Sequence, residues 1–321
     1  MDILKGYTKA YHEDYGDFYI KHLDIFDSEE IDEKDDHYKT HAASKGLPTT
    51  EEKIKQLKEE GSWGDKEERE ISDLNLTLRN LQKTKTKLVL KSDIENIESQ
   101  IKSTKEELQQ KQAEKSQLIG YTADTYSSKK INEYYVFATT YKDKKLKKKL
   151  FSKEEFDELS EQDILKFVQI FNYNSKKTSE ENIKRIALSG FFLNNFYLCK
   201  DNPKVYFGKP ITKLTYNESE LFSYGRYFKH ILSEMKNKPD EEIMDDPDKL
   251  IELYNIGQNS EKIKQSAEDS DASTVVGATK EDLERMGMSS PSEDKGVSLS
   301  QEAAKKGGKL SMDDLIKLHG M

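Results

Sequence analysis

The sequence contains little sulfur and no long apolar run. Cys199 is the single cysteine among 321 residues, which excludes a disulfide framework and any metal site built from several thiolates. No apolar stretch approaches the roughly 20 residues that a bilayer span needs, and the first residues hold no segment like a signal peptide. The sequence therefore predicts a soluble protein of a reducing compartment, without a membrane partner.

The motifs of common enzyme families are also missing. There is no glycine-rich phosphate loop, no nucleophile elbow and no His-Glu-x-x-His helix. His37 and His41 are spaced so that two imidazoles share one helix face, but no third ligand is near. Cys199 ends the most apolar segment, where a thiol is expected to stay protonated and to pack in a core. We therefore predict no enzyme activity, no metal site and no cofactor.

The chain also lacks a net positive charge. The chain has 52 Lys and Arg against 61 Asp and Glu, a net charge of −9, which disfavours general binding of nucleic acid. One basic run, residues 142–149, departs from this balance; its lysines include Lys144, Lys145, Lys147 and Lys148. A solvated loop between two helices is the favoured interpretation of the run, and a nucleic-acid contact is the alternative.

Apolar residues make up 34% of the chain and charged residues 35%, whereas a globular domain is about 45–50% apolar. Part of the chain must therefore be solvated. We predict a mainly α protein with four regions. These are a strand pair with helices over 1–62, an antiparallel coiled-coil hairpin arm over 63–119, a helical core domain over 120–256 and a disordered tail over 257–321.

The first region is expected to open with a β-hairpin. Residues 7–11 and 17–23 flank a turn, and the second of these segments alternates apolar and polar side chains. Asp27 precedes Glu30 by three residues, a spacing at which both side chains can satisfy free amides at the start of a helix. A polar helix should follow and end near residue 46.

The arm is predicted from two seams of apolar residues with alternating three- and four-residue spacing. The seam residues are Ile71, Leu74, Leu78, Leu81 and Leu88, followed by Ile94, Ile97, Ile101 and Leu108. Ser92 and Glu95 form a capping pair between the seams, so one helix should end and a second should return along it. Trp63, just ahead of the arm, is expected to be a packing anchor at its base.

The core domain is predicted from the aromatic and apolar residues between 121 and 235. Its helices should begin at the capping pairs Ser152 with Glu155, Thr178 with Glu181, and Thr215 with Glu218. The first predicted faces comprise Tyr126, Tyr134, Phe137 and Tyr141, and then Phe156, Leu159, Leu165, Val168 and Phe171. Residues 183–198 are apolar on nearly every side, which is typical of a central helix surrounded by others. Residues 205–207 read as a short strand.

The tail has too little apolar area to offset the entropy of ordering, so residues 257–311 are predicted to be disordered. Residues 311–319 have an N-cap and one apolar face, formed by Met312, Leu315, Ile316 and Leu318. A short amphipathic helix on a flexible linker is typical of a docking peptide. The alternative is a chain end without a partner.

Three segments resemble proteins of tailed bacteriophages. Residues 17–33 (DFYIKHLDIFDSEEIDE) look like the opening of tail assembly chaperones, in which a strand leads into an acidic helix. Residues 198–212 and 221–231 are similar to stretches of structural or assembly proteins of marine T4-like phages. The resemblance implies a protein of the host cytoplasm that holds an aggregation-prone tail component, such as the tape measure.

The favoured hypothesis is therefore a non-enzymatic, protein-binding role in bacteriophage assembly, as a tail assembly chaperone-like protein. Its partners would be tail components or further copies of the chain. The first alternative is a structural subunit of the tail, neck or baseplate, which would place the protein in the virion. The second is a nucleic-acid-associated protein that uses residues 142–149.

Overall fold

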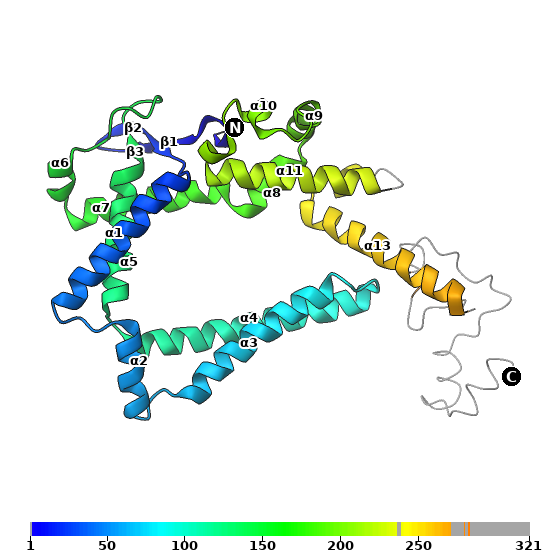
Figure 1. The fold of residues 1–321 in the computed structure, drawn as a ribbon, viewed down its shortest axis with the longest axis horizontal. Coiled ribbons are helices and arrows are strands. Elements are labelled where there is room, and N and C mark those ends of the chain that lie inside the picture. Colours follow the sequence, from blue (N-terminus) through cyan, green and yellow to red (C-terminus); the bar gives the residue numbers. More distant parts are fainter. Residues whose placement is uncertain (1, 236–238, 271–278, 280–281, 283–321) are drawn as a thin grey trace. The chain divides into compact units, whose positions relative to one another are not determined.

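The computed structural model describes residues 2–235, 239–270, 279 and 282. They form a mainly helical protein with one small antiparallel sheet near the N-terminus (Figure 1). The described residues divide into two compact units, one of 2–82, 100–235 and 239–254, and one of 83–99 and 255–270 with 279 and 282. The predicted class, mainly α with a small N-terminal hairpin, is confirmed.

The sheet consists of β1 (Tyr7–His12), β2 (Gly16–Lys21) and β3 (Thr140–Tyr141), in that order. Gly16, with φ +69°, adopts a left-handed conformation that favours glycine and closes the turn between β1 and β2. Phe18 and Ile20 of β2 are buried against Val136 and Phe167. The strand pair was predicted, whereas β3 was not, because Tyr141 was assigned to a helical face.

The helices follow in chain order. They are α1 (Ile25–Ser44), α2 (Thr50–Glu59), α3 (Asp65–Lys85), α4 (Lys91–Ile119), α5 (Ala123–Thr139), α6 (Lys153–Asp157), α7 (Glu161–Ser175), α8 (Glu180–Leu188), α9 (Gly190–Leu198), α10 (Pro203–Phe207), α11 (Tyr216–Glu234), α12 (Glu241–Met244) and α13 (Pro247–Ser270). Short 3-10 helices are η1 (Ile3–Lys5), η2 (Lys176–Thr178) and η3 (Ile211–Lys213). Among the described residues no helix is both long and apolar enough to cross a membrane.

Helix α1 begins earlier than predicted. Asp24 is its N-cap and accepts hydrogen bonds from the amides of Phe26 and Asp27, while the Asp27 carboxylate returns to the Asp24 amide. Asp27 is therefore the returning member of the capping box and not the cap, so the predicted start was wrong by one turn. Helix α1 packs along α5, and the Ser127 hydroxyl donates to the Asp35 carbonyl at 2.7 Å.

Trp63 anchors the start of α3, as predicted. Its side chain is 2% exposed, and its indole N–H donates to Glu68 at 2.7 Å. Burial of an indole with its N–H satisfied is a stabilising arrangement, because the large apolar ring leaves water without a lost hydrogen bond. The same Glu68 pairs with Lys115 of α4 at 2.7 Å.

Helices α3 and α4 occupy the region predicted to be the arm. Glu70 pairs with Lys111 at 2.8 Å, and Lys85 pairs with Glu98 at 2.6 Å. The first pair joins the start of α3 to the later part of α4, and the second joins the end of α3 to the beginning of α4. No residue of α3 is buried and its seam side chains are half-exposed, so coiled-coil packing of the pair stays a prediction.

The predicted central helix is not continuous. It breaks at Ser189, whose backbone is extended and whose hydroxyl accepts from the Phe192 amide, so that α8 ends and α9 begins there. The helix starts at Ser179 and not at Thr178. The buried faces of α8, α9 and α11 form one core that includes Ile183, Ala187, Phe192, Phe196, Leu221 and Phe228.

Two further predictions in this region were wrong, and one was right. The helix capped by Ser152 ends at Asp157, and Ser160 caps a separate α7; the resulting change of phase leaves Leu165 53% exposed. Residues 205–207 are helical, because Asn202 caps α10 and Pro203 occupies its first turn. The capping box of Thr215 and Glu218 at the start of α11 is present as predicted.

Helix α13 continues past Gly257 to Ser270, so the predicted start of the disordered tail lies too early. Ile256 is buried with Val89 and Ile94, which gives this part of the helix an apolar contact. Asp282 forms hydrogen bonds with Thr279 and accepts from the Lys91 amide at 2.9 Å. The predicted docking residues Met312, Leu315, Ile316 and Leu318 lie outside the described residues.

Candidate functional site

Five exposed apolar side chains lie within residues 191–211, on α9, α10 and η3. We call this set the α9–η3 surface; its members are Phe191 (64% exposed), Tyr197 (42%), Leu198 (81%), Val205 (65%) and Ile211 (67%). Single exposed apolar residues are normal on a protein surface, but several in one short segment are typical of a binding site. This concentration is the strongest functional feature of the first unit.

The local backbone holds these side chains outward. Lys200 and Asp201 have φ of 49° and 58°, a left-handed pair that reverses the chain between α9 and α10. Non-glycine residues adopt this conformation at an energetic cost, so the surrounding structure must compensate. The Asn202 side chain then accepts from the Lys204 amide and starts α10. Leu198 and Val205 consequently lie on either side of a tight turn.

Aromatic packing fixes α10 against α9. The ring of Tyr206 lies 5.1 Å from that of Phe192 and 6.0 Å from that of Phe196, measured between centroids. Phe192 and Phe196 are fully buried, and burial raises the pKa of the Tyr206 hydroxyl. Figure 1 shows the two helices adjacent to each other. The exposed residues thus project from a rigid support, which limits the entropy lost on binding.

The charge around the α9–η3 surface differs from that of the whole chain. Residues 190–213 contain four lysines and one aspartate, although the protein carries a net charge of −9. The lone Asp201 is paired with Lys229 at 2.9 Å, and Lys209 is paired with the buried Glu218 at 2.6 Å. Lys204 and Lys213 are exposed. The exposed charge on this segment is therefore mainly positive.

The predicted basic run forms a closed loop between β3 and α6. The Asp143 carboxylate accepts from the amides of Lys145, Lys147 and Lys148, and these hydrogen bonds lower the pKa of Asp143. The side chains of Lys144, Lys145, Lys147 and Lys148 are all exposed. Lys149 instead lies over the ring of Tyr141 at 4.4 Å. The loop is separate in sequence from the α9–η3 surface.

The other residues singled out from the sequence have ordinary surroundings. The Cys199 thiol is 5% exposed and donates to the Phe196 carbonyl at 2.9 Å, so it is part of the core. The rings of His37 and His41 lie 6.4 Å apart on α1. Across the described part of the chain, no three His, Cys, Asp or Glu side chains are grouped to hold a metal ion.

The α9–η3 surface was missed from the sequence because residues 183–198 looked apolar on all sides. Two sequence signals could have revealed it. Ser189 before Gly190 and Asn202 before Pro203 are each typical of the start of a helix. Together they divide the segment into short helices, each of which can bury only one side.

Comparisons with known proteins add no family to this picture. A scan against protein-family models, a search of curated proteins and a search of solved structures each found no match to this chain.

Proposed function

We propose that this protein is a non-enzymatic assembly factor that binds an apolar segment of another protein through the α9–η3 surface. The supporting observation is the exposure of Leu198, at 81%, and of its neighbours on a rigidly packed support. Large side chains left in water on a folded surface lower the free energy of the complex when a partner covers them. The lysines around them favour a partner with acidic flanks.

In the setting implied by the phage-like segments, the partner is a tail component held before it joins the particle. A chaperone-like protein of this kind needs an accessible apolar surface that its client can leave. Five large side chains over α9, α10 and η3 fit that requirement, since a small patch gives moderate affinity and a reversible complex. The protein would then act in the host cytoplasm.

Helices α3 and α4 support a second part of the proposal, an antiparallel hairpin arm. The Glu70–Lys111 and Lys85–Glu98 ion pairs lie at opposite ends of the two helices, as antiparallel alignment requires. In a virion subunit such an arm would interlock with a neighbour. In a chaperone it would extend the surface offered to the client.

The experiment compares the double variant Leu198→Asp/Val205→Asp with Leu165→Asp, a matched change at a side chain that is 53% exposed on α7. Affinity-tagged full-length protein is recovered from cells that make the assembly partners, and co-purified proteins are quantified by mass spectrometry. We expect one partner to fall by about tenfold in the double variant, a change of about 1.4 kcal/mol, and to be retained by Leu165→Asp. Equal recovery from both variants would contradict the proposal.

Mass spectrometry of purified particles separates the two assembly roles. A chaperone-like protein is absent from finished particles, whereas a subunit of the tail, neck or baseplate is present in fixed proportion to the other structural proteins. The nucleic-acid alternative predicts instead a salt-sensitive complex that disappears when Lys144, Lys145, Lys147 and Lys148 are changed to Glu.

A further inference from the structure

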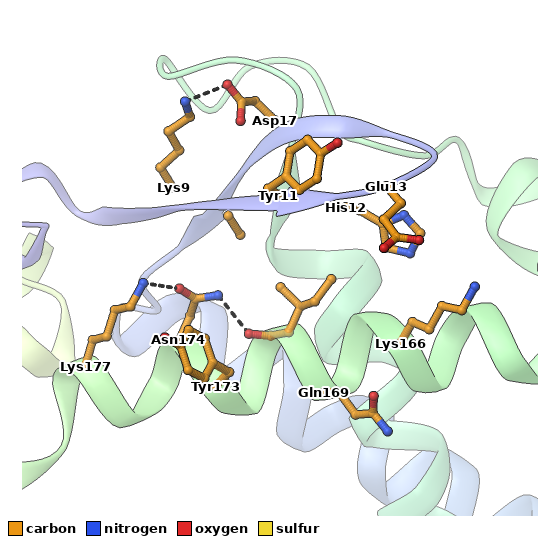
Figure 2. A pocket seen from close by; sticks show the side chains of 12 residues that line it. Lys9, Tyr11, His12, Glu13, Asp17, Lys166, Gln169, Tyr173, Asn174 and Lys177 are labelled. Carbon is orange, nitrogen blue, oxygen red and sulfur yellow. Dashed lines mark hydrogen bonds and ion pairs between the residues drawn. The ribbon is translucent and has the colours of Figure 1, made fainter.

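A groove runs between β1 and α7 in the first unit, and we call it the β1–α7 groove (Figure 2). Its volume is about 810 Å³, within the range of about 300–1,000 Å³ that is usual for ligand sites. One wall consists of the consecutive residues 9–13. The other includes Lys166, Ile170, Tyr173 and Lys177, which follow helical spacing along α7 and η2.

The consecutive residues show that the groove follows the edge of the sheet. Side chains of a strand alternate between two faces, so a cavity on one face would be lined by every second residue. Here Lys9, Ala10, Tyr11 and His12 all line it. Since β1 is the outer strand in the order β1-β2-β3, the groove lies beside its unpaired edge.

The register identifies the free backbone groups. The His22 amide donates to the Gly6 carbonyl at 2.8 Å, and hydrogen-bonded pairs alternate along an antiparallel ladder. Thr8, Ala10 and His12 therefore direct their backbone groups to β2, and Lys9 and Tyr11 direct theirs to the open edge. Apart from hydrogen bonds within the sheet ladder itself, no backbone hydrogen bond in the described residues reaches Lys9 or Tyr11. Such an edge can accept another strand.

His12 is a buried part of the groove wall. Its side chain is 3% exposed and stacks on Phe167 at 4.5 Å. The Asp14 amide donates to Nδ1 at 3.2 Å, so in the neutral ring the proton is on Nε2. Nε2 finds no hydrogen-bond partner in the described chain. Because Nε2 has almost no accessible surface, His12 contributes packing to the groove wall and is not a hydrogen-bond donor to a ligand in this arrangement.

Two lysines mark the ends of the groove. Figure 2 shows Lys177 on the left of the view, the side on which Lys9 lies, and Lys166 on the right, the side of His12. Among the described residues, the contacts of the Lys177 ammonium are with neutral groups, Asn174 at 2.8 Å and the ring of Tyr173 at 5.3 Å. Lys9 is already neutralised by Asp17 at 2.5 Å. On the helical wall, Lys166 lies 3.7 Å from the Asp163 carboxylate of its own helix, so within the described chain Lys177 is the lysine of the groove without an acidic partner.

The spacing of these lysines fits an extended peptide. Lys166 and Lys177 are eleven residues apart on α7 and the following η2, which corresponds to about 17 Å along the helix. The first and last Cα atoms of an extended five-residue segment are about 13 Å apart at 3.3 Å per step, and the long side chains of lysine and glutamate can cover the remaining distance. A peptide with acidic side chains at both ends would thus meet one lysine with each.

We propose that the β1–α7 groove binds an extended acidic segment of a partner protein, which joins the sheet as a new strand beside β1. Backbone hydrogen bonds to Lys9 and Tyr11 hold it, and the helical wall selects its charge. A second copy of the chain is disfavoured as the occupant, because its own β1 edge is flanked by α7. The proposal does not depend on the α9–η3 surface.

The probe is the fluorescein-labelled peptide Glu-Val-Thr-Val-Glu, compared with Lys-Val-Thr-Val-Lys and with the acidic peptide N-methylated at alternate residues. Binding to the full chain is followed by fluorescence polarisation at low salt. We expect the acidic peptide to bind at least about fivefold more tightly than either comparator. The N-methylated peptide loses backbone donors, and the basic peptide meets like charge.

Two variants test whether the peptide binds in the groove. Lys177→Glu reverses the charge at one end and leaves the ladder unchanged, while Tyr11→Pro removes one outward amide from an edge strand that tolerates proline. Each should weaken the acidic peptide by about fivefold. The matched control Lys153→Glu reverses an exposed lysine at the start of α6, outside the groove, and should bind normally. Equal effects of Lys177→Glu and Lys153→Glu would overturn the proposal, as would tight binding of the N-methylated peptide.

Amide hydrogen exchange measured by NMR on the full chain gives an independent readout. Without peptide, the Lys9 and Tyr11 amides should exchange rapidly and the Ala10 amide slowly. Saturating acidic peptide should protect Lys9 and Tyr11. Protection of both amides in the absence of peptide would show that the edge is occupied by the chain itself or by a second copy, and would overturn the inference. Double variants of the α9–η3 surface should leave all of these results unchanged.

Discussion

At the residue scale, His22, which follows β2, shows how burial determines whether a histidine is protonated. His22 is 7% exposed, and its Nε2 lies 2.8 Å from the Thr8 hydroxyl. Burial lowers the pKa of His22 to about 4, assisted by the charge of Lys209. The imidazole is therefore neutral near pH 7 and acts as a packing residue with one hydrogen bond, because protonation would place a charge inside the protein.

This shift predicts a pH-dependent stability. Between about pH 4 and pH 6.5 the unfolded chain binds a proton at His22 that the folded chain does not, so stability falls as pH decreases through this window. From pH 6.5 to pH 4.5 the loss should be about 2 kcal/mol. Urea denaturation at the two pH values measures it. His22→Gln should show a smaller loss than the natural chain; an equal loss would contradict the assignment.

At Gly225, one additional carbon atom would determine whether α11 can pack closely against α9. A Cβ there would lie 2.7 Å from Cε1 of Phe192 and 3.2 Å from Cε2 of Phe196. Both rings are fully buried and stacked on each other, so neither can move freely. The close approach of α11 to α9 therefore requires glycine at this position.

We expect Gly225→Ala to lower the free energy of unfolding by about 1–3 kcal/mol, since overpacking exceeds the gain of about 1 kcal/mol from helix propensity. The control is Gly190→Ala, where a Cβ meets nothing within 4 Å; it should be neutral or stabilising. Chemical denaturation compares the two. A stabilised Gly225→Ala variant would show that the α9–α11 contact is looser than described.

At the scale of elements, predictions from the sequence succeeded where the deciding interactions are local. Thr215 with Glu218, and Ser152 with Glu155, start helices through hydrogen bonds within four residues. The break at Ser189 was missed because position 192 is Phe, which offers no returning carboxylate to complete the pattern. An N-cap residue without a returning carboxylate three residues later is a weaker sequence signal for a helix start.

Elements fixed by distant contacts could not be predicted in this way. Strand β3 has two residues and exists because Thr140 and Tyr141 pair with β2. The middle of α13 packs through Ile256 against Val89 and Ile94, which are far away in the sequence. The α9–η3 surface was hidden for a related reason, since composition alone does not show which side of an apolar helix is covered.

The pairing of α3 with α4 has a direct test at this scale. Glu70→Lys and Lys111→Glu should each lower the thermal midpoint by replacing attraction with repulsion. The double variant restores an ion pair with reversed sign and should recover part of the loss. The effect should shrink in high salt, because the pair is largely exposed to solvent. Additive losses in the double variant would argue against an antiparallel arm.

At the scale of the whole molecule, the central question is what the exposed apolar residues do. A chain with a net charge of −9 and 35% charged residues has ample means to keep its surface polar. The α9–η3 surface departs from that composition both in apolar area and in sign of charge. Function is therefore expected where the surface departs from what solubility favours.

If these side chains serve binding, removing them should not harm folding. Leu198→Asp should change the free energy of unfolding by less than about 0.5 kcal/mol, because the side chain is 81% exposed. Phe192→Ala, at a fully buried position of the same helix, should cost about 3–5 kcal/mol. Urea denaturation distinguishes them. A large loss for Leu198→Asp would mean that this residue packs within the folded chain.

The most direct measurement is site-specific photo-cross-linking in cells that contain the assembly partners. A photoreactive amino acid is placed at position 198 of the full chain, and at position 165 as the control. The proposal predicts one discrete protein adduct from position 198 and none from position 165. The absence of an adduct at position 198, or the same adducts from both positions, would contradict a binding role for the α9–η3 surface.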